Sequence, residues 1–128
     1  MEQITIEEGL LLQEEEWGLR LVAGNGIEIN NTNLLPRIEK IIKLAKEREK
    51  NRILIEASAA TRNVSITKLF QAGELLLQLR TLGFKVAFVA PQFINTDESL
   101  FVENVGSNRG FYVRYFPDSG EALNWILS

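Results

Sequence analysis

The sequence predicts an α/β domain with a mixed, mostly parallel sheet of about five strands, antiparallel N-terminal strands and four helices. Short apolar runs at residues 53–55 and 86–89 are typical of strands that are buried on both faces of a parallel sheet. Between them lies a segment whose apolar residues recur every three or four positions, which is the spacing of an amphipathic helix. The chain has 128 residues, of which 45% are apolar, so we expect one domain over residues 1–128.

The N-terminal segment is predicted to form strands. Apolar residues between positions 4 and 13 are interrupted by Glu7 and Glu8, and residues 17–23 carry an apolar side chain at every second position. This period of two predicts a half-buried strand. Residues 24–26, Gly-Asn-Gly, are expected to end that strand because these residue types tolerate positive φ. Residues 27–29 are expected to continue it briefly.

Each predicted helix has a candidate capping residue. We expect Asn33 to cap the first helix and Ser65 to cap the second, which ends near Gly83. Thr96 is expected to cap a short third helix and Asp118 the last. Residues 58–64 are expected to form a polar connection, and residues 111–116 the last strand. The second helix is expected to turn one apolar face inward: Ile66, Leu69, Phe70, Gly73, Leu76 and Leu77.

The composition excludes several kinds of chemistry. The chain has no Cys and no His, so it has no disulfide, no thiolate nucleophile, no imidazole base and no Cys- or His-bound metal. We therefore predict no enzymatic activity, no cofactor and no metal site. An enzymatic alternative would have to rely on Arg62, Asn63 and Glu56.

The charge pattern bears on partners. The net charge is −3, which disfavours nucleic acid as a partner. The chain has no apolar run of about 18 residues and no basic start typical of a signal peptide, so we predict a cytoplasmic protein with no membrane span. A basic run near the first helix indicates a solvated helix face or, alternatively, a surface for anions or lipid headgroups: Arg37, Lys40, Lys43, Lys46, Arg48, Lys50 and Arg52.

From Trp17 to Ser128 the chain resembles the STAS family, the domain of anti-sigma-factor antagonists and of sulfate-transporter tails. The similar segments are Gly26-Ile27-Glu28 with Thr32, residues 53–58, residues 85–91, residues 112–116 and residues 118–123. The chain resembles a bacterial branch of stand-alone STAS-like proteins still more, both in its length and in the sequence of the strand at residues 85–91.

This resemblance implies a STAS-like fold and a non-catalytic surface that another protein or a small ligand occupies. Regulatory STAS domains carry a phosphorylated Ser at the start of the second helix, preceded by Asp. This chain has Val64 and Asn63 at those positions, with Ser65 adjacent. We therefore do not expect a kinase-switched antagonist.

Ligands of open α/β sheets bind beyond the carboxyl ends of the strands, beside helix N-termini. That rule selects the loops at residues 58–65, 91–96 and 116–120, where helix amides and Arg62 would suit a small anion. The candidate binding residues are Ser58, Thr61, Arg62, Asn63, Ser65, Gln92, Asn95 and Thr96.

The leading hypothesis from the sequence is a STAS-like regulatory or interaction domain that binds a protein partner. Aromatic residues cluster in the last third of the chain, and apolar side chains on both faces of its strand indicate either helices on both sides of the sheet or self-association as a homodimer. The alternative is a binder of a small anionic or lipid ligand in a pocket between the second and third helices, with a layout similar to that of CRAL-TRIO lipid-transfer proteins. That pocket would be lined by Leu69, Phe70, Phe93 and Phe101.

Overall fold

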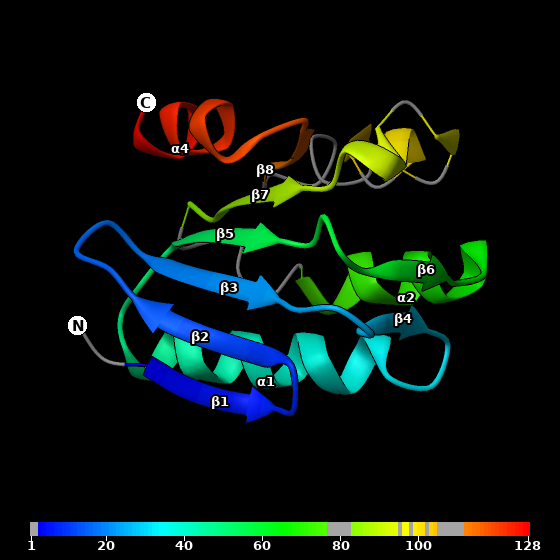
Figure 1. The fold of residues 1–128 in the computed structure, drawn as a ribbon, viewed down its shortest axis with the longest axis horizontal. Coiled ribbons are helices and arrows are strands. Elements are labelled where there is room, and N and C mark those ends of the chain that lie inside the picture. Colours follow the sequence, from blue (N-terminus) through cyan, green and yellow to red (C-terminus); the bar gives the residue numbers. More distant parts are fainter. Residues whose placement is uncertain (1–2, 77–82, 95, 98, 102, 105–111) are drawn as a thin grey trace.

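The computed structural model describes residues 3–76, 83–94, 96–97, 99–101, 103–104 and 112–128. Its main sheet confirms the predicted α/β class and has six strands in the order β1-β2-β3-β5-β7-β8 (Figure 1). Strand β2 is antiparallel to both β1 and β3, and β3, β5, β7 and β8 are parallel. The strands are β1 (Gln3–Glu7), β2 (Leu10–Glu14), β3 (Leu19–Ala23), β5 (Arg52–Glu56), β7 (Lys85–Val89) and β8 (Tyr112–Phe116).

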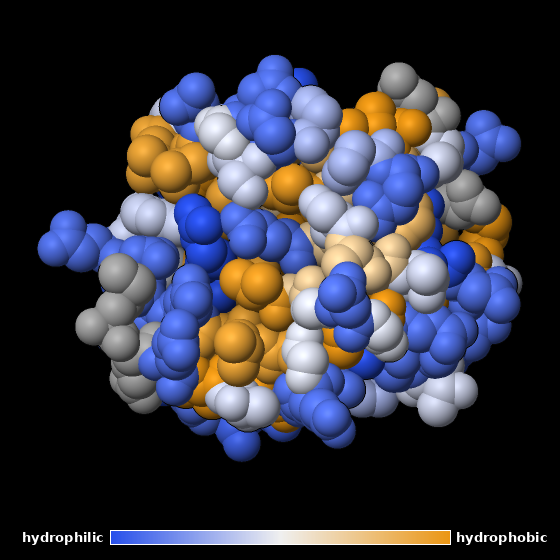
Figure 2. All heavy atoms as spheres, viewed as in Figure 1, coloured by the Kyte–Doolittle hydropathy of each residue, from blue (hydrophilic) through white to orange (hydrophobic). Residues whose placement is uncertain are grey.

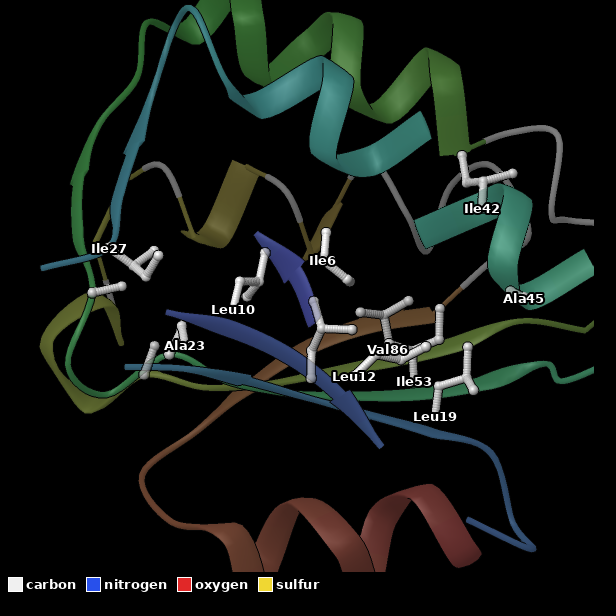
Figure 3. Close-up of a cluster of buried hydrophobic side chains, with 14 of the residues drawn as sticks. Ile6, Leu10, Leu12, Leu19, Ala23, Ile27, Ile42, Ala45, Ile53 and Val86 are labelled. Atoms are coloured by element: carbon white, nitrogen blue, oxygen red, sulfur yellow. The ribbon is translucent and has the colours of Figure 1, made fainter. Parts of the chain in front are cut away.

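Helices cover both faces of this sheet. Helices α1 (Leu34–Glu47) and α2 (Ile66–Leu76) lie on one face, and α4 (Ser119–Leu127) lies on the other (Figure 3). A 3-10 turn, η2 (Pro91–Phe93), follows β7, and the described residues between 97 and 104 are helical. Helix α4 packs on β5, β7 and β8. Figure 2 shows hydrophobic side chains at the surface over the N-terminal strands.

The buried apolar run of β5 explains why two layers of helices are needed. Ile53 is 1% exposed and points toward α1 and α2, whereas Leu54 is fully buried against the layer of α4. Successive side chains of a strand point to opposite faces, so an uninterrupted apolar strand needs cover on both sides. The prediction of a doubly covered strand is confirmed at this position.

A second, two-stranded sheet was not predicted. Strand β4 (Glu28–Asn30) pairs in parallel with β6 (Thr61–Asn63), so the expected polar connection at residues 58–64 contains a strand. Both strands have three residues and no buried side chain. Their pairing depends on the two segments lying side by side in space, and no local apolar pattern reports it.

Three of the four predicted helix caps are confirmed. The side-chain oxygens of Ser65, Thr96 and Asp118 each accept a hydrogen bond from the backbone N–H three residues later. Asn33 occupies the cap position of α1, but its side chain makes no capping bond, because its side-chain oxygen accepts from the backbone N–H of Asn30 at 2.9 Å and its amide nitrogen donates to the carbonyl oxygen of Glu28 at 2.7 Å. Asn33 therefore holds the chain between β4 and α1 in place, and the prediction that its side chain caps the helix is wrong.

The inward face of α2 differs from the prediction. Leu69, Ala72 and Gly73 are buried, whereas Ile66 is 50% exposed and Phe70 is 44% exposed. Neighbouring helix residues are about 100° apart around the axis, so a buried stripe centred near Leu69 leaves Phe70 at its edge. Leu77, also predicted to point inward, lies outside the described residues.

Candidate functional site

The space between the sheet and helices α1 and α2 is not completely filled. It contains a hollow of about 80 Å³ and a second hollow of about 120 Å³. The two hollows adjoin, because six residues line both of them: Ile29, Leu34, Ile38, Ala57, Leu76 and Phe88. We call the two hollows together the apolar cavity.

Small residues are one reason why this part of the layer stays open. Ala57 follows β5 and lines both hollows, and Ala72 and Gly73 of α2 line the first. Farther from the cavity, larger side chains such as Leu12, Leu19 and Ile53 fill the same layer (Figure 3). Since protein interiors are otherwise close-packed, two adjoining hollows in one layer mark a place where a ligand can fit.

One charged side chain, Arg62 of β6, lines the first hollow. Its guanidinium donates to the hydroxyl of Tyr115 at 3.1 Å and to the hydroxyl of Thr96 at 3.2 Å. It also lies over the ring of Phe93, 4.3 Å from the ring centroid. Tyr115 and Phe93 line the same hollow, so an arginine held by two hydroxyls and an aromatic ring forms one wall of it.

Arg62 lacks a counter-charge within the described residues: it makes no ion pair there. Arg37, which lines the second hollow, is different. Its Nε donates to Glu7 at 2.7 Å, and that hydrogen bond holds the pKa of Glu7 below its ordinary value. The two arginines of the cavity therefore differ in charge compensation.

The other basic residues near α1 hold the N-terminal strands in place. Arg48 is paired with Glu14, Lys40 donates to the carbonyl oxygen of Ile6, and Lys50 donates to a backbone carbonyl oxygen of the loop after β2. Together with Arg37 they join the helix and its end to the strands and the loop that follows them. These contacts give much of the basic run a structural role in place of a free surface for anions.

The predicted site residues have separate positions. Arg62 and Thr96 are hydrogen-bonded to each other at the cavity. The side-chain amide of Gln92 donates to two backbone carbonyl oxygens of the loop after β5, each at 2.9 Å, and the hydroxyl of Ser58 contacts the carbonyl oxygen of Val89 at 3.4 Å. Three other predicted site residues are exposed and do not line the cavity: Thr61, Asn63 and Ser65. Asn95 lies outside the described residues.

The expected position of the pocket is corrected by the structure. The apolar cavity lies between the sheet and α1 and α2, not between the second and third helices. Leu69 and Phe93 line it as predicted, whereas Phe70 and Phe101 do not. The first helix was not expected to line the pocket. Which helix packs against which strand depends on the topology of the sheet, and the sequence pattern does not specify it.

The residues named for an enzymatic alternative are not assembled. Arg62 lines the cavity, whereas Glu56 alternates with Ile55 along β5 and lies on the face of α4. There Glu56 accepts hydrogen bonds from Arg20 at 3.0 Å and from Ser119 at 2.7 Å. These bonds tie β5 to β3 and to α4, which is a structural role.

Two absences apply to the part of the chain that the structure describes. None of their helices is both long and apolar enough to cross a membrane. No three acidic side chains among them gather closely enough to hold a metal ion.

Comparison with known proteins supports the fold. No family model matches the chain, and no curated protein matches it. Among solved structures, it is similar to an uncharacterized protein of the DUF3478 family with a SpoIIAA-like fold from Shewanella loihica PV-4. The TM-score is 0.54 at 14% identity, and the match covers 91% of each chain. The chain therefore has a SpoIIAA-like, that is STAS-like, fold.

Proposed function

We propose that this chain is a non-catalytic, STAS-like domain that binds an apolar small molecule in the apolar cavity. The cavity is the observation that carries this proposal: its lining is apolar except at a few positions such as Arg62 and Arg37. An empty cavity of about 150 Å³ lined by Leu, Ile and Phe stays dry and binds benzene. Hollows of about 80 and 120 Å³ suit groups of comparable size.

The size of the cavity limits the ligand. Sites for drug-sized molecules usually enclose at least about 300 Å³, and each hollow here is smaller. We therefore expect a ligand with a short apolar chain or one or two small rings. Octan-1-ol is a suitable neutral probe, because its chain could span two adjoining hollows and its affinity would come mainly from apolar burial.

Titration calorimetry with octan-1-ol tests this function. The protein should bind the alcohol, and Ala57→Val should weaken binding at least about tenfold, because the added methyl groups enter both hollows. Ala87→Val is the matched control, since Ala87 is fully buried in the cluster beneath α4. It should leave the affinity unchanged. Absence of binding to the native protein, or equal binding by Ala57→Val, would contradict the proposal.

A protein partner is the second candidate function, and the outer face of α2 favours it. Ile66 and Phe70 lie one helical turn apart and are 50% and 44% exposed. Exposed large apolar side chains that are neighbours on a helix are typical of interaction surfaces. A second copy of this chain is the partner that can be tested directly.

Sedimentation equilibrium measures that self-association. If α2 forms a homodimer interface, the native protein should sediment as a dimer at micromolar concentration, and Phe70→Ser should shift it to the monomer. A native monomer throughout the concentration range would count against self-association through this face.

A further inference from the structure

We infer that the molecule bound in the apolar cavity carries an anionic head group, a carboxylate or a phosphate, which Arg62 recognises. This inference rests on the proposed function, because it assigns the chemical class of the ligand of that same cavity. It would make the ligand a short amphiphile with an acidic end.

Arg62 carries a charge that no ion pair among the described residues balances. The side chain is half-buried, and within the described residues it contacts hydroxyl groups and aromatic rings but makes no ion pair. A cation withdrawn from water is costly unless an opposite charge or strong hydrogen-bond acceptors replace the water. The ring of Phe93 compensates only part of that cost. An anion in the hollow would complete the site.

The geometry of the Arg62 guanidinium suits an anion. Arg62 has five N–H donors, and hydroxyl groups of Tyr115 and Thr96 each take one. The hydroxyl of Thr96 itself donates to the carbonyl oxygen of Phe93 at 2.8 Å, so Thr96 is fixed and in turn positions the guanidinium. A planar guanidinium held in this way can offer two parallel N–H groups to a carboxylate or a phosphate.

Arg37, in contrast to Arg62, is paired with a carboxylate. Both arginines line the cavity, but Arg37 already has the carboxylate of Glu7 and also donates to the carbonyl oxygen of Glu28 at 2.7 Å. An arginine with these partners has little to gain from a ligand anion. The structure therefore assigns the head group to the end of the cavity at Arg62.

The test compares three probes that share one chain: octanoate, octyl phosphate and octan-1-ol, titrated calorimetrically at pH 7. At least one of the two anions should bind about tenfold or more tightly than octan-1-ol, and the tighter anion identifies the head group. Arg62→Gln should remove this preference while changing the affinity for octan-1-ol less than about threefold. Arg37→Gln is the matched control and should keep the preference.

The outcomes separate this inference from the proposed function. If octan-1-ol binds as tightly as both anions, or if Arg62→Gln keeps the preference, the anionic head is overturned and the apolar site stands. If none of the three probes binds, both are overturned. Arg62→Lys guards against a loss of fold in Arg62→Gln: it keeps the charge without the planar fork, and its preference for the anion should lie between those of Arg62→Gln and the native protein.

Discussion

Two buried alanines should respond oppositely to the same substitution. Ala57 is 2% exposed and lines both hollows, whereas Ala87 is fully buried in the cluster beneath α4, away from the cavity. Replacing either alanine by Val adds the same two methyl-sized groups to the side chain. The difference in outcome therefore measures the space around each alanine.

The expected magnitudes follow from burial and packing. Each added group that enters empty apolar space stabilises the fold by at most about 0.8 kcal/mol, so Ala57→Val should change the free energy of unfolding by between zero and about +1.6 kcal/mol. Extra groups in a filled core cost about 1–3 kcal/mol through strained rotamers and displaced backbone. Ala87→Val should therefore be destabilising by that amount.

Urea denaturation followed by circular dichroism measures both changes. The slope of the free energy of unfolding against urea concentration should be the same in the native protein and both variants, so that a shift in the midpoint reports a change in stability alone. If Ala57→Val destabilises the protein as much as Ala87→Val, the space at Ala57 is already filled. The apolar cavity would then have no room for a ligand at Ala57.

Three further substitutions test other parts of the structure. Glu7→Gln removes the ion pair with Arg37 and should cost about 0.2–1 kcal/mol at pH 7. The hydrogen bond from Arg37 lowers the pKa of Glu7 below 4.5, so this stabilisation is present above about pH 4.5 and is lost as the pH falls through the lowered pKa. The free energies of unfolding of the native protein and the variant should therefore converge in acid. A difference between them that is independent of pH would contradict this prediction. Gly18→Ala should cost at least about 3 kcal/mol, because a Cβ there would lie 2.1 Å from the carbonyl oxygen of Arg52; an unchanged urea midpoint would exclude this close approach. Glu56→Gln should cost about 1–3 kcal/mol through the loss of a charged hydrogen-bond acceptor between two strands, and a neutral result would show that the bond contributes nothing to stability.

The layered fold could be predicted because its signals are local. Ile53, Leu54 and Ile55 form a short apolar run that is typical of a doubly covered strand, and the structure places Ile53 and Leu54 on opposite faces. The pairing of β4 with β6 could not be predicted in the same way. Each strand has only three residues, too few to show a periodicity, and the two pair because the surrounding elements bring them together.

The candidate site was predictable only in part. Arg62 could be identified because it is a basic residue in a loop beyond a buried strand. The cavity depends on which side chains face one another across the layer, so the contribution of Ala57 and Gly73 is visible only in three dimensions. The hydroxyl of Tyr115, on the last strand, reaches Arg62 across 53 residues of sequence, and no spacing rule indicates that contact.

The most direct test of the apolar site is an NMR measurement of contacts between octan-1-ol and side-chain methyl groups. The account predicts intermolecular nuclear Overhauser effects from the alkyl chain to the methyl groups of Ile38, Ala57 and Leu69, which line the cavity. It predicts none to Leu54 or Ile126, which lie in the cluster beneath α4. Effects confined to that second cluster, or no effects at saturating alcohol, would contradict it.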